Sequence, residues 1–464
     1  MDKSMKKASS YYLVGTIFNK GIGFITVPIF TRILTMDDYG IVTTYNSWVA
    51  IISMFISLAL YMAIRSSFVD YENKVNDFLS TVLLFTVGYG FCVSVIICAA
   101  IYLLPISINI GLVVLCLLQA IGSALIEDVS QFLMMRINYR FRTAVMVIPN
   151  LLSTLIAIVA IKYIVHHNQY LGRIVPSSLI TFGTALLLLL IYLPKGKNRF
   201  NKEYLKYGLT ISLPLVLHGI ALNILAQSDR TMISAIKNTS ETAIYGLIYN
   251  FSMIATVITT AFDGIWVPFF MRNMKKEKYD PINEYSVKYI ELMTIAMIGV
   301  VLVGPEIVKL LSIEPYWEGI TIIPPIVLAN YLIFLYTLYV YIEHYYKKTV
   351  FISINTTIAA VVNILLNYLF IRNWGYIGAA YSTLISYALS LILHYIYSRR
   401  LNRSLFPMKQ LLLPLLVLSM IVVVFYMCIN LWPIRWFVGI LSLLLMIIKE
   451  RKFLKYVLNQ KTSL

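Results

Sequence analysis

The sequence has 464 residues, of which 59% are hydrophobic and 13% are charged, and its mean hydropathy is +0.80. Soluble domains are about 45–50% apolar and about 25% charged, so this composition excludes a water-soluble globular protein, which could not cover so much apolar surface. The net charge of +17 does not indicate a nucleic-acid-binding protein, because the basic residues lie in short segments between apolar runs.

The first apolar run, residues 9–34, is too long for the apolar region of a signal peptide and lacks a small-residue cleavage site, so it is predicted to be a membrane span. A span needs about 20 apolar residues. The chain is therefore predicted to be an all-α polytopic membrane protein with about fourteen transmembrane helices. The weak breaks at Pro105 and Pro433 make twelve the lower bound. The predicted spans are 9–34, 39–64, 78–104, 106–135, 143–165, 174–193, 207–228, 242–270, 285–311, 319–343, 350–371, 375–398, 410–429 and 433–449.

The distribution of lysine and arginine predicts the orientation. With the N-terminus inside, the cytoplasmic segments hold 29 of these residues and the outer segments hold 8, while Lys20 lies within a span. This bias follows the positive-inside rule and places both termini in the cytoplasm. No segment between spans is long enough for an extramembrane catalytic domain, so the function is expected within the membrane.

A faint internal repeat suggests two lobes of six helices. The pair Tyr39-Gly40 in the second span recurs 206 residues later as Tyr245-Gly246 in the eighth. Six crossings return the chain to the same side, and duplicated halves with a site between them are a common transporter plan. The predicted divisions are residues 1–200 for the N-terminal lobe, 201–400 for the C-terminal lobe, and 401–464 for two additional helices and a basic cytoplasmic tail.

The N-terminal block carries a family resemblance. It reads Asn19-Lys20, then Pro28-Ile29-Phe30-Thr31-Arg32-Ile33-Leu34-Thr35, then Asp38-Tyr39-Gly40. This succession resembles the O-antigen and capsule repeat-unit flippases (Wzx-type) of the MATE-like MOP transporter superfamily.

The resemblance implies a bacterial cytoplasmic-membrane transporter, not an enzyme, that works by alternating access between two bundles around a cationic cavity. Its implied substrate is an undecaprenyl-diphosphate-linked oligosaccharide that moves from the inner to the outer leaflet. Other glycan-assembly proteins are further candidate partners, and no cofactor or nucleic acid is implied.

Lys20 is the clearest candidate for substrate binding. It lies about eleven residues into the first span, which at about 1.5 Å per residue places it near the bilayer centre. A charge at this depth is costly and needs a role. Either it attracts the anionic diphosphate, or it forms a structural ion pair with Glu127, Asp128, Asp263 or Glu291.

Four more residues are candidates for the cavity: Asn19, Arg32, Arg230 and Asn250. The arginines suit phosphate oxygens but would be equally stable reaching toward the membrane interface. The amides could bind sugar hydroxyls or join helices.

The acidic residues of the predicted spans form a second pattern. Glu127, Asp128, Asp263, Glu291 and Glu343 all fall in the cytoplasmic third of their spans. They could form inner-gate ion pairs with arginines, namely Arg65, Arg136 or Arg272. Alternatively, they could bind a coupling ion, H⁺ or Na⁺, because desolvated carboxylates can carry protons.

Other residue patterns favour structural roles. The four cysteines and five histidines show no metal-ligand spacing, so no metal site is predicted. A stripe of small residues every four positions (Gly378, Ser382, Ser386, Ser390) predicts close helix packing. Thr35-x-x-Asp38 is similar to a capping box and predicts a helix start.

Competing functions remain open. A MATE-like relative could carry another cargo, either a lipid II or teichoic-acid precursor or a drug or cation, although the deepest charge, Lys20, argues against a cationic cargo. A membrane-embedded glycan polymerase would be expected to have a large outer loop, and an acyltransferase would need a histidine in polar surroundings. Neither feature is evident in the sequence.

Overall fold

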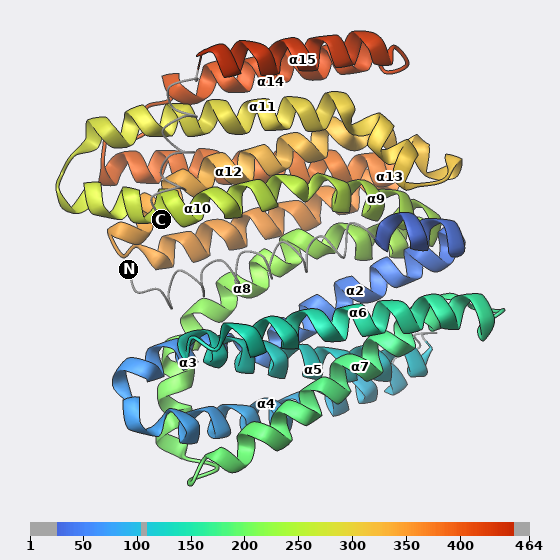
Figure 1. The fold of residues 1–464 in the computed structure, drawn as a ribbon, viewed down its shortest axis with the longest axis vertical. Coiled ribbons are helices and arrows are strands. Elements are labelled where there is room, and N and C mark those ends of the chain that lie inside the picture. The colour runs from blue at the N-terminus through green and yellow to red at the C-terminus, as the bar shows by residue number, and fades with distance from the viewer. Residues whose placement is uncertain (1–25, 104–108, 450–464) are drawn as a thin grey trace. The chain divides into compact units, whose positions relative to one another are not determined.

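A computed structural model describes residues 26–103 and 109–449. The chain divides into two compact units, residues 1–234 and 235–464 (Figure 1). Most of the described residues are helical and none is in a strand, which confirms the all-α prediction. The lobe boundary predicted at residue 200 marks the end of the sixth span in the sequence repeat. The division into compact units does not test it, so it stays a prediction.

The first unit contains a helical segment at residues 26–33 and seven longer helices. These are α2 (Met36–Ser57), α3 (Leu60–Asp70), α4 (Val75–Leu103), α5 (Ile110–Met135), α6 (Tyr139–Tyr163), α7 (Tyr170–Tyr192) and α8 (Lys202–Ile236, of which residues 202–234 lie in this unit), with short 3₁₀ turns η1 (Glu72–Lys74) and η2 (Leu193–Lys195).

The second unit contains α9 (Thr239–Ser252), α10 (Ile254–Lys275), α11 (Tyr279–Leu311), the 3₁₀ segment η3 (Glu314–Ile322), α12 (Ile323–Tyr345), α13 (Thr349–Leu401), α14 (Lys409–Met427) and α15 (Trp432–Lys449). In this unit α12 packs on α13, and α14 and α15 both lie against α11 (Figure 1).

Among the described residues, ten helices are long and apolar enough to cross a membrane, or eleven if the bent helix α8 is counted as one span. The 53 residues of α13 hold two of the predicted spans, on either side of a break at Gly375, and α15 supplies a shorter apolar helix. Each predicted span from 39–64 onward coincides with helices of the structure, so about fourteen spans fit. The predicted span 9–34 lies mostly outside the described residues.

The predicted helix start at Thr35 is confirmed. Its side chain accepts a hydrogen bond from the backbone N–H of Asp38 at 3.1 Å, and its hydroxyl donates to the Asp38 carboxylate at 3.0 Å. The predicted span 39–64 is not one straight helix, however. Leu58 and Ala59 both have positive φ, and they divide it into α2 and α3.

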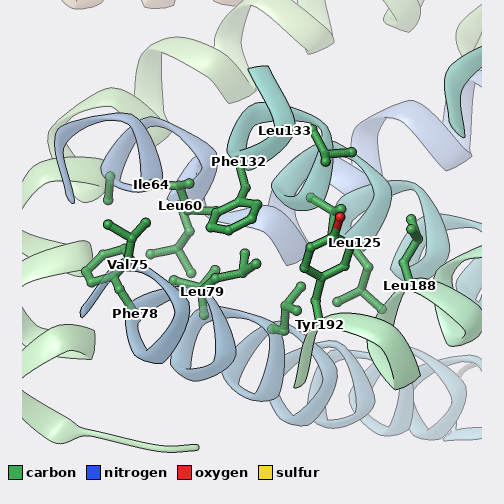
Figure 2. Packing of buried hydrophobic residues seen from close by; sticks show 14 of the residues in the cluster. Leu60, Ile64, Val75, Phe78, Leu79, Leu125, Phe132, Leu133, Leu188 and Tyr192 are labelled. Carbon is green, nitrogen blue, oxygen red and sulfur yellow. The ribbon is translucent and has the colours of Figure 1, made fainter. Parts of the chain in front are cut away.

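The core of the first unit lies where α3, α4, α5 and α7 meet. Figure 2 shows Leu60, Phe78, Phe132 and Tyr192, one from each helix, converging on this cluster. All four side chains are buried. In a membrane the hydrophobic effect does not drive helices together, so this close packing of large side chains contributes through dispersion contacts.

The segment that joins α7 to α8 is fastened to the start of α4. Asp77 accepts hydrogen bonds from the backbone N–H groups of Lys197 at 2.6 Å and Asn198 at 3.3 Å. Thr81 accepts one from the N–H of Asn201 at 3.1 Å. These bonds satisfy backbone donors of an otherwise irregular segment, so the segment is held to the first unit.

Gly375 divides α13 into two helices. Its φ of 56° and ψ of −140° lie in a region that residues with a Cβ rarely adopt. Directly after it, the N–H of Tyr376 donates to Glu241 Oε2 at 2.9 Å. A carboxylate at a helix N-terminus is favourable, so Glu241 on α9 stabilises the start of the second half of α13.

Candidate functional site

The predicted cavity residues are only partly described. Lys20 and Asn19 lie outside the described residues. Arg32 is exposed, and its Nη1 donates to the carbonyl of Pro28 at 2.8 Å. Arg230 is buried near the end of α8, and its Nη1 donates to Gln227 Oε1 at 2.5 Å. Asn250 is the exposed residue of an otherwise buried stretch of α9.

A further cation lies beside the first helix. The guanidinium of Arg173, on α7, stacks over the ring of Phe30 with its central carbon 4.4 Å from the ring centroid. Its Nη1 also lies 3.4 Å from the hydroxyl of Thr154 on α6. Arg173 is one of the eight basic residues of the predicted outer segments, and nothing in its local pattern reveals contact with a helix about 140 residues away.

Three helices of the first unit bring polar residues together near the end that is predicted to be cytoplasmic. Arg65 Nε, on α3, donates to Gln131 Oε1 at 3.0 Å, and Gln131 Nε2 donates to Glu127 Oε1 at 2.5 Å, both on α5. Arg65 is one of the predicted gate partners, and here Gln131 lies between it and Glu127. Arg136, another predicted partner, donates to Asn76 Oδ1 at 2.9 Å.

Asp128 differs from its neighbour Glu127 in being completely buried. Its Oδ2 accepts a hydrogen bond from the hydroxyl of Thr86, on α4, at 3.1 Å. Its Oδ1 is also buried and has no hydrogen-bond partner in the structure. A buried carboxylate oxygen without a donor is costly, which makes Asp128 unusual.

Glu343 and His394 form a buried pair that sequence reasoning missed. Nδ1 of His394, on α13, lies 3.0 Å and 2.9 Å from the two oxygens of Glu343, on α12, and the hydroxyl of Ser398 donates to Glu343 at 3.1 Å. The scattered histidines predicted polar surroundings for none of them, and His394 corrects that prediction. All three side chains are at most 1% exposed, and Ser398 donates to the carboxylate and not to the imidazole. This arrangement joins two helices and offers a substrate no access.

Glu291 lies in a different setting, in a groove between α11, α14 and α15. The cavity has a volume of about 490 Å³ and is lined mainly by apolar side chains. Its polar members include Glu291, Thr294, Lys409 and Gln410. Asp263, the remaining acidic candidate, lies on α10, but its side chain is outside the described part of the chain.

The amides of α13 confirm the structural interpretation of the small-residue stripe. Asn355 donates to the carbonyl of Ser390 at 3.3 Å, Asn363 lies 3.4 Å from the Thr383 hydroxyl, and Ser382 bonds to Asn367. All of these side chains are buried. The two halves of α13 are therefore joined by hydrogen bonds between helices, as expected for polar residues in lipid.

The described residues show no cluster of side chains suited to a metal ion. Among the described residues, no group of three or more histidine, cysteine, aspartate or glutamate side chains could hold an ion. The polar clusters of the two units instead pair donors with acceptors across helices.

Comparison with known proteins identifies the family. Residues 5–274 match the family described as "Polysaccharide biosynthesis protein", which is more than half of the chain. No curated protein matches the chain.

Several solved structures share the fold. One is an inward closed lipid II flippase, MurJ, with a TM-score of 0.65 and 17% identity over 95% of this chain and 99% of that one. Another is an inward-facing multidrug resistance MATE transporter, with a TM-score of 0.63 and 13% identity over 87% and 99% of the two chains. A MOP superfamily transporter from Pyrococcus furiosus gives a TM-score of 0.53 and 13% identity over 86% and 96%.

These similarities agree with the resemblance in the N-terminal block and with the helical membrane architecture. The chain therefore belongs to the polysaccharide biosynthesis protein family and has the fold of the MOP superfamily transporters.

Proposed function

We propose that this protein flips an undecaprenyl-diphosphate-linked oligosaccharide from the inner to the outer leaflet of the bacterial cytoplasmic membrane. The observation that carries the proposal is the family match over residues 5–274 in a chain whose described residues are almost all in apolar helices. Because the described part of the chain is built almost entirely from such helices, its action is expected within the bilayer. Transport of a glycan precursor agrees both with the polysaccharide biosynthesis family and with action within the bilayer.

The fold supports transport of a lipid-linked cargo. MurJ, a structure with the same fold, is a lipid II flippase, and MATE transporters with this fold have been solved in inward-facing and outward-facing conformations. We therefore propose alternating access as the mechanism. The identities of 17% and below leave the glycan itself to experiment.

Electrostatics supports the direction of transport. An inside-negative potential of 100 mV is worth about 2.3 kcal/mol per elementary charge, so it favours outward movement of an anionic diphosphate headgroup. Cations in the first unit would offset desolvation of that headgroup. We propose this role for Lys20, with Asn19, Arg32, Arg230 and Asn250 as further substrate contacts.

The test uses proteoliposomes that contain the purified protein and an undecaprenyl-diphosphate-linked oligosaccharide. We expect the wild-type protein to move the glycan to the opposite leaflet, where an added glycosidase reaches it. Vesicles without protein should show no such movement. Equal rates in the two preparations would reject the proposed function.

The Lys20→Ala variant tests the site. We expect slower flipping, because the variant loses the charge that balances the diphosphate in the low-dielectric interior. Lys237→Ala serves as the matched control, since Lys237 is exposed, and it should flip at the wild-type rate. Unimpaired flipping by Lys20→Ala would reject the role of Lys20 and leave the function intact.

A further inference from the structure

Asp128 occupies a place in the first unit where a charged carboxylate is poorly supported. Its side chain is 0% exposed. The hydroxyl of Thr86 is its hydrogen-bond donor at 3.1 Å, and it reaches Oδ2. The other oxygen, Oδ1, is buried without a hydrogen-bond partner. An ionised carboxylate in a low-dielectric site needs a cation or several donors, and Asp128 has one neutral donor.

Glu343 in the second unit is a buried carboxylate whose two oxygens both have polar partners. It is equally buried, yet both of its oxygens lie within 3.0 Å of His394 Nδ1, and Ser398 donates a further bond. The contrast indicates that burial alone does not leave a carboxylate oxygen unpaired here.

The arginines described in the polar cluster around Asp128 have other contacts. Arg65 donates to Gln131, which donates in turn to Glu127. Tyr61, also on α3, lies within electrostatic reach of Arg65, Glu127 and Asp128. From α6, Arg142 Nε donates to Ser130 at 3.0 Å. Asp128 therefore forms no ion pair with Arg65 or Arg142.

We propose that Asp128 is a proton-binding site of the transport cycle. A proton on Oδ1 neutralises the carboxyl without any further ligand, and Thr86 continues to donate to Oδ2. A metal ion held by carboxylate, imidazole or thiolate side chains would require several of them together, and the described residues contain no group of three or more. This inference deepens the proposed function and rests on it where transport is concerned.

The position of Asp128 suits exchange of that proton with one side of the membrane. It lies seven residues before the end of α5 at Met135, which corresponds to about 10 Å along the helix. That end is the one predicted to face the cytoplasm. When the proton leaves, the anion attracts the guanidinium of Arg65, which like Asp128 lies within electrostatic reach of Tyr61, and the Arg65–Gln131–Glu127 chain would rearrange. Proton release would thus change contacts between α3 and α5.

The first test observes the proton directly and needs no substrate. Infrared spectra of the purified protein near neutral pH should contain the carbonyl band of a protonated carboxylic acid. We expect Asp128→Asn to lose that contribution, because an amide does not give this band. The matched control is Glu127→Gln, which alters the neighbouring carboxylate on the same helix and should keep the band. Identical band intensity in the wild type and Asp128→Asn would overturn the proposal.

A second variant covers the case in which Asp128→Asn does not fold. Thr86→Val keeps the carboxyl and removes its donor, so it should shift the frequency of the same band. An unshifted band in Thr86→Val would overturn the assignment to Asp128.

The transport test uses proteoliposomes with an imposed gradient of one pH unit. Compared with vesicles without a gradient, the imposed gradient should change the flipping rate of the wild type by up to about tenfold, the ratio of proton activities across one pH unit, and should leave the rate of Asp128→Asn unchanged. Gradient-insensitive flipping by the wild type would overturn the coupling. If the infrared band is present but the wild type does not flip the glycan, the proposed function fails and the proton site stands.

Discussion

Arg435 is a buried arginine whose charge is balanced by hydrogen bonds and an ion pair. Its side chain is 1% exposed, yet each part of the guanidinium has an acceptor. Nη1 donates to the carbonyl of Leu302 at 2.6 Å, Nε donates to the carbonyl of Cys428 at 3.1 Å, and Nη2 pairs with Glu306. A planar guanidinium can serve several acceptors at once, so one residue joins α15 to α11 and to the end of α14.

This arrangement gives a prediction for Arg435→Ala. The substitution removes the cation that pairs with Glu306, which keeps a hydrogen bond from Trp436 Nε1 at 3.2 Å. Removing one partner of a fully buried ion pair costs about 3–5 kcal/mol, and the partly exposed Glu306 places this case at the lower end. We expect a lower thermal unfolding midpoint in detergent. The control is Arg372→Ala, which alters an exposed arginine also predicted to face outward and should change the midpoint little. Equal midpoints for the two variants would contradict the role given to Arg435.

At the scale of the helices, the turns between spans follow a common plan. Ile137, Glu277 and Lys347 each have positive φ in the three-residue link after α5, α10 and α12. In each link an N–H reaches back five residues, from Asn138 to Leu133, from Lys278 to Asn273 and from Lys348 to Glu343. This is the Schellman pattern of helix C-termini, usually built on glycine. Here it satisfies carbonyls where each helix leaves the membrane.

Gly375 is the position where a helix break depends on the residue type. A Cβ at this φ and ψ is strained, and the break also brings the N–H of Tyr376 to Glu241. We expect Gly375→Ala to destabilise the protein by about 1–3 kcal/mol, measured as a shift of the unfolding midpoint. Gly183→Ala on α7 is the matched control, because a Cβ there meets no atom within 4 Å. That variant should be neutral or stabilised by up to about 1 kcal/mol, and a similar loss in both variants would argue against strain at Gly375.

At the scale of the whole molecule, the predicted orientation determines what each polar cluster can do. The positive-inside bias predicts that the Arg65–Gln131–Glu127 chain and Asp128 lie toward the cytoplasm and that Arg173 lies toward the outside. The proton site and the direction of substrate movement both depend on this assignment, so it requires its own measurement.

Thiol labelling tests the orientation. The background carries no cysteine, after replacement of Cys92, Cys98, Cys116 and Cys428. His167→Cys and Asn198→Cys then place single thiols at exposed positions at opposite ends of α7. A membrane-impermeant maleimide should label position 167 in intact cells, and should label position 198 only after permeabilisation. The reverse pattern would invert the topology, and labelling of both in intact cells would contradict a span between them.

The sequence by itself determined the class, the spans and the predicted orientation, because lipid as a solvent demands long apolar helices and charge bias at their ends. It also predicted the helix start at Thr35 and the packing stripe in α13, since both are local patterns. Only the tertiary structure decided which buried polar groups have partners. Glu343 meets His394 across 51 residues, Arg435 meets Glu306 across 129, and Asp128 meets Thr86 across 42. Whether a buried charge is paired depends on which helices are neighbours. Hydropathy and local residue spacing do not reveal which helices pack together.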